Sequence, residues 1–342
     1  MRTDPGSLTD VAGLRVGHHT DARRPTGCTV VLCEAGCSAG VDVRGAAPGT
    51  RETELLRPEN TVQQIHGLLL SGGSAFGLAA ADGVMRWLVE RGHGFAVGAA
   101  RVPIVPAAVI FDLQLGDPAI TPDAAAGHAA CEAATRPNRQ RGNVGAGAGA
   151  TVGKLLGRER AMKGGLGMAS LQVQGQTLAA LVVANPVGDV LDCASGERLA
   201  GPRGADGRPQ STEQALLDGA PLGGPGPGSA TTLGVIATDA RLSKTQCHKL
   251  AQIAHDGFAR SIHPVHQLMD GDVMFALATG ASGRDGDLGL LGALAAEVVA
   301  RAVADAVRSA QGLGAPYHLP AWRDNQASST PAQPGPDRSR PW

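Results

Sequence analysis

The sequence predicts an α/β or α+β protein in which helices cover one or more sheets. Short apolar runs recur along the chain, and several are apolar throughout, which indicates strands buried on both faces. Between them lie segments whose apolar residues recur three and four positions apart, as in helices. The runs expected to form strands are 28–33, 108–115, 168–174, 178–184, 231–238 and 272–279.

The expected helices begin at recognisable capping residues. Ser74 is expected to be the N-cap of a helix that continues through AFGLAAADGVMRWLVER, and Thr121-Pro122 opens an Ala-rich helix. Ser243 and Gln246 form a capping box before KLAQIAHDGFAR. The longest helix is expected over 290–307.

Two stretches rich in Gly and Pro, 201–210 and 219–230, flank a short capped segment, STEQALLD. They predict an exposed, mobile connection over 201–230 that leads directly into the run TTLGVIAT. The tail 324–342 is polar and Pro-rich, and we expect it to be disordered.

Composition excludes several partners. The formal net charge of −1, from 30 Lys and Arg against 31 Asp and Glu, provides no basic stripe for nucleic acid or an anionic membrane. Only 3% of residues are aromatic, which disfavours base-stacking surfaces. No secretory leader or long apolar span is evident, so a cytoplasmic protein is expected. The 6 cysteines show no C-x-x-C spacing and are expected to be reduced and mostly buried.

Two motifs suggest other chemistries, but their spacing is wrong. In NVGAGAGATVGKLL (143–156), Lys154 is followed by Leu155 rather than by the Ser or Thr of a phosphate loop. Close backbone packing at a strand crossing is the preferred interpretation of these glycines. In SGGSAFGLAA, the position that should be the second glycine of a serine-hydrolase elbow is Phe76, so Ser74 is favoured as a cap.

A third cluster, His263, His266, Asp270 and Asp272, has the residue types of a metal site. Pro264 makes this segment extended or a turn, however, whereas His-x-x-His usually binds metal from a helix. The alternative is that the two carboxylates, two residues apart at a strand start, point to one side and polarise a neighbouring group.

The junction Ser229-Ala230-Thr231-Thr232 suggests a candidate for that group, because a Gly/Pro connection ends there in a small residue followed by a hydroxyl residue. If Thr231 attacked the Ala230 carbonyl, cleavage would leave Thr231 with a free amine able to act as general base for its own hydroxyl. An ordinary strand start explains the same spacing.

From about Leu8 to Arg323 the chain resembles the DmpA-type L-aminopeptidases, the BapA-type β-peptidyl aminopeptidases and the nylon-oligomer hydrolase. The resemblance is carried by LTDVAGLRVGH, VDVRGAAPGTRET, LLLSGGSAFGLAAADGV, VPAAVIFDL, VVANPVGDVLD, TTLGVIATDARLS and HPVHQLMDGD.

This resemblance implies a single domain over 1–323 with a four-layer αββα sandwich, similar to N-terminal-nucleophile hydrolases but differently connected. It implies self-cleavage into an α chain of 1–230 and a β chain of 231–342, with Thr231 as nucleophile. Asn185 matches an oxyanion-stabilising amide, Asp270 and Asp272 match polarising carboxylates, and Lys154 matches a lysine near the nucleophile. The resemblance implies no cofactor. It also implies that the protein assembles as a homo-oligomer, commonly a tetramer.

Two positions depart from the family pattern. Ala230 stands where Asn is common before the nucleophile, which leaves Ser229 and Thr232 as neighbouring cleavage candidates. Phe111 stands where relatives have a Tyr at the site, which removes a phenolic donor and bears on substrate binding.

The function predicted from the sequence is therefore an autoprocessed aminopeptidase that hydrolyses short peptides, amino-acid amides or esters through a Thr acyl-enzyme. Two alternatives remain: a metal-dependent hydrolase using the His263 to Asp272 cluster, and a non-catalytic binder of small ligands that keeps the fold uncut.

Overall fold

The computed structural model describes residues 5–223, 226 and 229–327. Nine strands form one hydrogen-bonded sheet with the order β10-β11-β14-β16-β2-β4-β7-β3, and β1 pairs with β2 beside this path. These strands are β1 (Arg15–Thr20), β2 (Gly27–Val43), β3 (Thr50–Arg51), β4 (Ile65–Ser71), β7 (Ala107–Val109), β10 (Gly165–Val173), β11 (Gln176–Ala184), β14 (Leu233–Thr238) and β16 (Val273–Ala278).

The sheet divides into two layers at β2, whose 17 residues pair with different strands at its two ends. Its first half pairs with β1 and β4, and Ser38–Val43 pair with β16. The register shifts between Leu32 and Cys37 mark the change. The pairs β14–β16 and β4–β7 are parallel, and the other pairs on the path are antiparallel.

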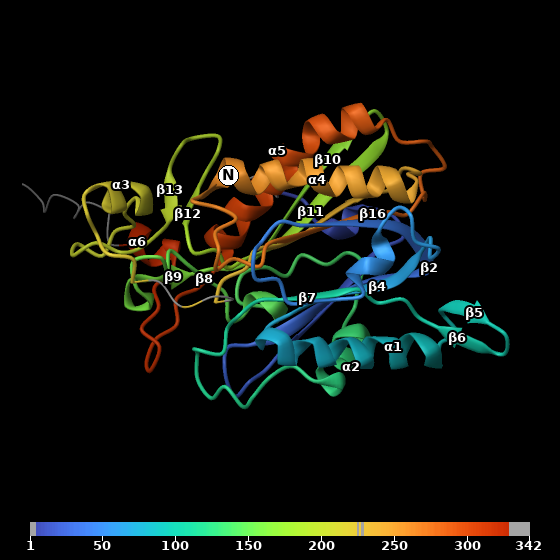
Figure 1. Ribbon diagram of the computed structural model, residues 1–342, viewed down its shortest axis with the longest axis horizontal. Helices are drawn as coiled ribbons and strands as arrows, with labels where there is room; N and C mark the ends of the chain where they lie inside the picture. Colours follow the sequence, from blue (N-terminus) through green and yellow to red (C-terminus); the bar gives the residue numbers. More distant parts are fainter. Residues whose placement is uncertain (1–4, 224–225, 227–228, 328–342) are drawn as a thin grey trace, which may run out of the picture.

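Helices cover the outer face of each layer, as Figure 1 shows. On one face lie α4 (Lys244–Ser261) and α5 (Leu288–Ser309), and on the other lie α1 (Ala80–Glu90) and α2 (Ala124–Glu132). Shorter helices are α3 (Thr212–Leu217), α6 (Trp322–Ala327) and the 3-10 turns Leu8–Asp10, Thr53–Leu56, Ser74–Ala79, Gly145–Gly147 and Arg158–Arg160. Outside the main sheet lie β5 (Phe95–Val97), β6 (Ala100–Val102), β8 (Thr151–Val152), β9 (Met162–Lys163), β12 (Asp189–Leu191), β13 (Arg198–Ala200) and β15 (Ile262–His263).

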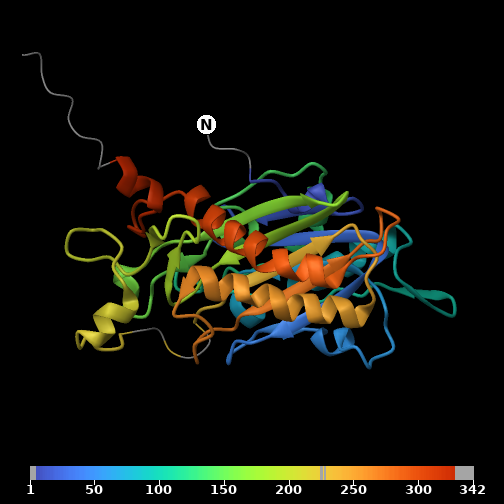
Figure 2. The same ribbon diagram turned by 90° about the horizontal axis from the view of Figure 1, so that it is seen from above.

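Alternate residues of the strands enter different cores, as the pleat of a strand requires. In β11, Leu178 and Val182 pack under α4 and α5, whereas Leu181 and Val183 face the other sheet layer. A third core lies under α1 and α2. The predicted four-layer αββα arrangement is therefore confirmed, and the turned view in Figure 2 shows α4 and α5 running side by side.

Several predicted boundaries are confirmed. The capping box of Ser243 and Gln246 precedes α4, Ser211 caps α3, and α5 is the longest helix, with 22 residues. The glycines of 143–156 do pack closely: a Cβ on Gly147 would lie 2.4 Å from the Leu166 nitrogen.

Four predictions of local structure were wrong. Ser74 caps no helix; it is the first residue of the 3-10 turn Ser74–Ala79, with a φ of 53°, and Gly73 occupies the capping position. The Ala-rich helix α2 is capped by Asp123, whose carboxylate accepts the Ala126 N–H, rather than by Thr121.

The other two corrections concern strand and tail ends. The strand expected over 108–115 ends at Val109, which pairs with Ser71, the last residue of the neighbouring β4. The following Asp112 pairs with the buried Arg24 guanidinium at 2.7 Å. Helix α6 covers Trp322–Ala327, so disorder does not begin at Asp324; the rest of the expected tail, 328–342, lies outside the described residues.

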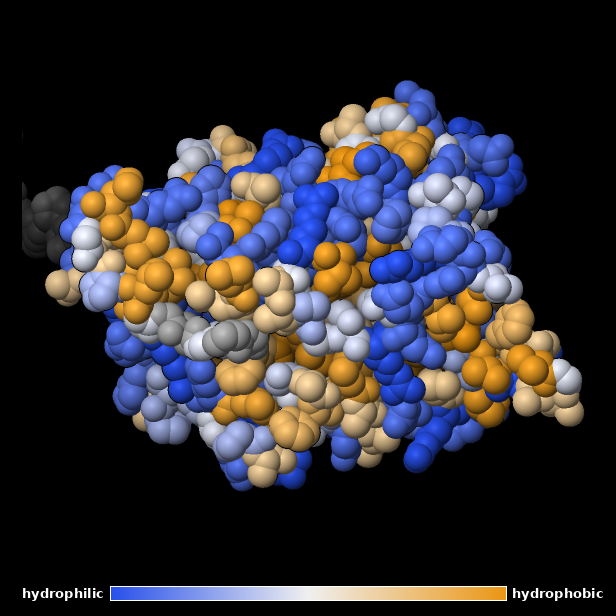
Figure 3. Space-filling view, in the orientation of Figure 1, coloured by the Kyte–Doolittle hydropathy of each residue, from blue (hydrophilic) through white to orange (hydrophobic). Residues whose placement is uncertain are grey.

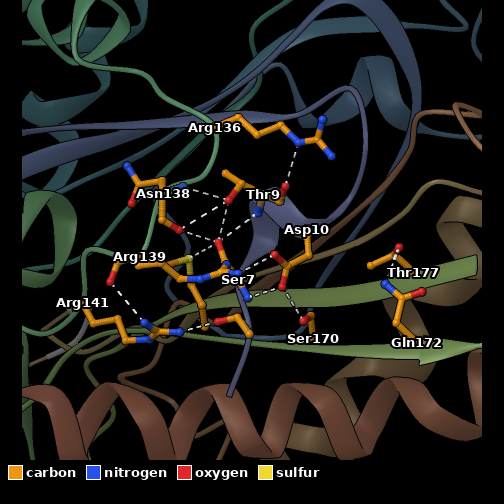
Figure 4. A network of polar contacts seen from close by, with 12 residues as sticks. Ser7, Thr9, Asp10, Arg136, Asn138, Arg139, Arg141, Ser170, Gln172 and Thr177 are labelled. Atoms are coloured by element: carbon orange, nitrogen blue, oxygen red, sulfur yellow. Dashed lines mark hydrogen bonds and ion pairs between the residues drawn. The ribbon is translucent and has the colours of Figure 1, made fainter. Parts of the chain in front are cut away.

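The first described residues are fastened to the sheet by a polar network (Figure 4). The Ser7 hydroxyl donates to the Asn138 carbonyl at 2.6 Å, and Asp10 accepts from Ser170 at 2.6 Å and from Arg139 at 2.8 Å. This network joins the segment before β1 to β10.

Candidate active site

Thr231 lies at the end of the Gly/Pro connection, two residues before β14 begins. Its side chain is buried, with 3% of the residue exposed, and its hydroxyl donates to the Ala230 carbonyl oxygen at 2.5 Å. The Gly271 N–H donates to the same oxygen at 2.9 Å. A hydroxyl and a backbone donor therefore meet on the carbonyl of the Ala230–Thr231 bond.

Asn185 follows the last residue of β11 and holds Thr231 through its main chain, because its carbonyl oxygen accepts the Thr231 N–H at 3.1 Å. Its side-chain oxygen accepts from the Thr151 N–H at 2.9 Å and from the Lys154 ammonium at 2.8 Å. The amide nitrogen makes one long hydrogen bond, 3.5 Å, to the Phe111 carbonyl. The orientation of the amide is thus fixed through its oxygen, and its N–H2 group has donor capacity to spare.

Lys154 is a buried lysine directed at Asn185. Its ammonium also donates to the main-chain oxygen of Asn185, at 2.9 Å. Burial lowers the pKa of the Lys154 ammonium to about 7, although the nearby Asp270 and Asp272 favour its charged form. The lysine can therefore gain and lose a proton near neutral pH.

Asp270 is fully buried just ahead of β16. One carboxylate oxygen accepts the Gln267 N–H at 3.0 Å, and the other, Oδ1, has no hydrogen-bond partner among the described residues. Burial, and then the neighbouring Asp272, raise the pKa of the Asp270 carboxyl to about 7.

Asp272 connects the site to His266. Its Oδ1 accepts the Thr232 N–H at 2.6 Å, and its Oδ2 accepts from His266 Nδ1 at 2.8 Å. The carboxylate thus holds the residue after Thr231 on one side and an imidazole on the other.

Sheet topology explains why these residues meet. Strands β11, β14 and β16 are neighbours, and Leu233 pairs with both Val183 and Val273. Because β11 runs antiparallel to the other two, its carboxyl end lies beside their amino ends. Asn185, Thr231 and Asp272 therefore reach one edge of the sheet from segments far apart in the sequence.

Most of the predicted site residues converge here. Hydrogen bonds join Thr231 to Ala230 and Asn185, Asn185 to Lys154, and Asp272 to Thr232, and Asp270 lies beside Ala230 in an isolated β-bridge. Phe111 contributes its main-chain carbonyl. His263 lies elsewhere, in β15 opposite Asp189. No group of three or more His, Cys, Asp or Glu residues is arranged to hold a metal ion within the described ranges.

Two participants were not predicted in these positions. Gly271 was overlooked, although a Cβ there would lie 2.7 Å from the Thr231 hydroxyl oxygen and 2.6 Å from the Ala47 carbonyl oxygen. Its signal in the sequence is a glycine between two aspartates. His266 was considered only as a metal ligand, and no local pattern showed that it would pair with Asp272.

The fold matches solved structures of two aminopeptidases. A β-aminopeptidase from a Burkholderia species superposes with a TM-score of 0.70 at 23% identity, over 98% of this chain and 97% of that one. The L-aminopeptidase D-Ala-esterase/amidase of Ochrobactrum anthropi, described as a variant of the Ntn hydrolase fold, has a TM-score of 0.70 at 21% identity, over 96% and 94% of the two chains.

The chain belongs to peptidase family S58, whose family model matches residues 6–318. It is therefore a hydrolase of peptide bonds. An uncharacterized aminopeptidase of Mycobacterium tuberculosis (strain ATCC 25618 / H37Rv) is 44% identical, over 93% of this chain and 97% of the relative. A 6-aminohexanoate-oligomer endohydrolase of Kocuria sp. (strain KY2) is 32% identical, over 87% and 85% of the two chains. The predicted family is confirmed.

Proposed function

We propose that this protein is an aminopeptidase that cuts itself between Ala230 and Thr231 and then uses Thr231 as its nucleophile. The observation that carries the proposal is the pair of contacts on the Ala230 carbonyl, from the Thr231 hydroxyl at 2.5 Å and from the Gly271 N–H at 2.9 Å. A hydroxyl beside a carbonyl that a backbone donor already polarises suits an acyl shift.

In self-cleavage, the Thr231 oxygen attacks the Ala230 carbonyl carbon, and the Gly271 N–H stabilises the negative charge that develops on the oxygen. The peptide C–N bond breaks as the proton of the hydroxyl passes to the leaving nitrogen, which leaves an ester on the Thr231 oxygen and a free amine on Thr231. Water hydrolyses the ester and releases Ala230 as a carboxylate. The products are the proposed chains 1–230 and 231–342.

In the mature enzyme, the freed amine is the proposed base for the Thr231 hydroxyl, because an α-amine ordinarily has a pKa of about 7.7–8.0. The Asn185 carbonyl, which accepts the Thr231 N–H at 3.1 Å, would hold that amine. The Asn185 amide and the Gly271 N–H supply the oxyanion donors. The charged groups nearest to these donors and to the amine are Lys154, Asp270 and Asp272.

The two chains stay together in this proposal. Strand β11 belongs to the first and pairs with β14 of the second over six residue pairs. Because the strands on both sides of the cut share one sheet, breaking one peptide bond leaves their hydrogen bonds and cores intact.

The proposed substrates are short peptides, amino-acid amides or esters with a free N-terminus. The test is hydrolysis of L-alanine p-nitroanilide and its N-acetyl derivative by purified protein and by a Thr231→Ala variant. We expect release of nitroaniline from the free-amine compound by the wild type only. Equal turnover by both proteins would contradict the proposal.

A metal-dependent reaction is the alternative that the His263 to Asp272 cluster suggested. In the structure, His266 and Asp272 hydrogen-bond to each other, which engages two of the four candidate ligands. We expect hydrolysis to survive exhaustive treatment with a chelator, and loss that zinc restores would favour the alternative. No helix within the described residues could cross a membrane. The cytoplasmic location and the homo-tetramer stay predictions.

A further inference from the structure

A cavity of about 330 Å³ lies next to the candidate active site. Its lining includes Thr151, whose N–H and hydroxyl donate to the side-chain oxygen of Asn185 at 2.9 and 3.2 Å. The main-chain oxygen of Asn185 accepts the Thr231 N–H at 3.1 Å. The hydrogen bonds of one asparagine therefore connect the cavity wall with the proposed nucleophile, and the volume is in the range of cavities that bind small molecules.

Two segments that hold the Asn185 amide also form walls of this cavity. The amide oxygen accepts from Thr151, and the amide nitrogen donates to the Phe111 carbonyl at 3.5 Å. Leu115, four residues after Phe111, lines the cavity together with Thr151. A substrate whose reacting carbonyl accepts from the Asn185 amide can therefore extend from the nucleophile into this cavity.

Two arginines line the same cavity, and both donate to main-chain oxygens. Arg158 donates to the Gln114 carbonyl. Arg203 donates to the Ala161 carbonyl at 3.3 Å and to the Glu159 carbonyl. These acceptors are neutral, and among the described residues neither guanidinium forms an ion pair. The carbonyls thus hold both guanidinium groups in place but leave their charges uncompensated.

The charges around the cavity favour an anion as its occupant. Among the described residues that line it, Glu159 is the only acidic one, against the two arginines. Partial burial lowers the pKa of the Arg158 guanidinium, because its charged form loses part of its hydration there. A carboxylate bound by guanidinium donors replaces that hydration with charge-assisted hydrogen bonds.

The surface around α3 differs from this cavity in its chemistry. There Leu217 and Leu222 are 81% and 69% exposed, in the hydrophobic area at the left of Figure 3. Apolar side chains cannot compensate the charge of a carboxylate. The groups suited to bind an anionic end of a substrate are therefore the two arginines of the cavity.

We propose that this cavity binds the free C-terminal carboxylate of a short peptide substrate, on the leaving-group side of the bond that is cut, with Arg158 and Arg203 as the donors. This inference rests on the proposed function. The mature enzyme then recognises a short peptide at both ends, the free N-terminus beside Thr231 and the free C-terminus in the cavity. Amides and esters that lack a carboxylate are turned over without this second interaction.

The test compares L-alanyl-L-alanine with L-alanyl-L-alaninamide, which differ only in the C-terminal group. The value of kcat/KM for each is measured from the loss of the peptide by chromatography. For the wild type we expect the free acid to exceed the amide by about tenfold or more, since hydrogen bonds between charged groups are about twice as strong as neutral ones.

Arg158→Gln and Arg203→Gln each remove one positive charge from the cavity and should bring the acid-to-amide ratio of kcat/KM toward one. Arg208→Gln is the matched control, because Arg208 is an exposed arginine of the same Gly/Pro-rich stretch as Arg203 and does not line the cavity. It should keep the wild-type ratio. A general loss of folding lowers both rates together and leaves the ratio unchanged.

A wild type that turns over both peptides equally well would overturn the inference. A preference for the free acid that survives both substitutions would overturn it too, because the carboxylate would then be bound elsewhere. L-Alanine p-nitroanilide separates these results from the proposed function: if nitroaniline is released while either result is seen, the cavity assignment is wrong and the proposed function stands. If the wild type turns over neither the anilide nor the peptides, both are wrong.

Discussion

The ammonium of Lys154 donates to both the main-chain and the side-chain oxygen of Asn185, at 2.9 and 2.8 Å. The Thr231 N–H donates to the same main-chain oxygen. One asparagine thus links the buried lysine to the backbone of the proposed nucleophile. The following predictions test what each member of this arrangement does.

Asn185→Asp keeps the size of the side chain and its acceptor oxygen but replaces the N–H2 donor. If that donor stabilises the oxyanion, kcat should fall by about 10²–10³-fold while KM changes little. Asn143→Asp is the control. The Asn143 amide donates to the Gln311 carbonyl at an exposed position, so its replacement should keep wild-type kinetics. An Asn185→Asp enzyme with more than a tenth of the wild-type kcat would remove the amide from the oxyanion role.

Gly271→Ala should block self-cleavage. Its Cβ would lie 2.7 Å from the Thr231 hydroxyl oxygen and 2.6 Å from the Ala47 carbonyl, so either the nucleophile or the backbone must shift. A displacement of about 1 Å is enough to cost about 10²-fold in rate. Gly314→Ala, where nothing lies within 4 Å of the added Cβ, is the control. The chain lengths are compared by intact mass, and normal cutting by Gly271→Ala would show that this glycine is not needed.

His266→Ala removes the imidazole that donates to Asp272 at 2.8 Å. We expect His266 to be a positioning residue, because Asp272 also accepts the Thr232 N–H beside the nucleophile. The variant should lose about 10²-fold in kcat with a smaller change in KM. His263→Ala is the matched control, and equal losses in both variants would indicate a general effect on folding instead.

The thermal stability of Asp270→Asn should depend on pH in a defined direction. Burial raises the pKa of the Asp270 carboxyl from 3.8 to about 7, so between these values the folded state binds more protons than the unfolded state. Rising pH therefore destabilises the wild type in this window, by up to about 1.4 kcal/mol per pH unit. Melting curves should show the stability of the variant, relative to the wild type, increasing from pH 4 to pH 7; a constant difference would contradict the shifted pKa.

Lys154→Met should show the opposite trend. Burial lowers the pKa of the Lys154 ammonium from 10.5 to about 7, so the unfolded state binds more protons between these values. The free energy of unfolding of the wild type therefore increases as the pH rises from 7 toward 10.5, because the unfolded chain binds the proton more tightly than the buried Lys154 does. Relative to the wild type, Lys154→Met should be most stable near pH 7 and should lose that advantage by pH 10, as measured by the same melting curves.

Six strands of the main sheet and the helices α1, α2, α4 and α5 could be predicted, because apolar periodicity and capping residues are local signals. Strands β1, β3 and β4 were not predicted. The capping box of Ser243 and Gln246 is an example. Where a long-range contact decides, the sequence was misleading. The strand after Ala107 ends at Val109, and the following Asp112 pairs with the distant Arg24. The cap of α2 is a local error instead, since Asp123, two residues after Thr121, accepts the Ala126 N–H.

In the candidate site, too, local patterns predicted some features and long-range contacts determined others. Thr231 and the two aspartates were found from the residues, but the spacing around Thr231 alone favoured an ordinary strand start. The family resemblance decided between the interpretations and was the sole source of Asn185. Their convergence depends on β11, β14 and β16 being neighbours, which no local pattern encodes. The contact between Gly271 and Ala230 is a main-chain hydrogen bond, which residue types do not reveal.

The central claim is that Thr231 is created as an N-terminal nucleophile by cleavage after Ala230. Intact mass and N-terminal sequencing of the purified wild type and of Thr231→Ala test it most directly. The account predicts a β chain beginning TTLGV in the wild type and an uncut chain in the variant. A wild-type chain that stays whole, or a cut that persists in Thr231→Ala, would contradict it.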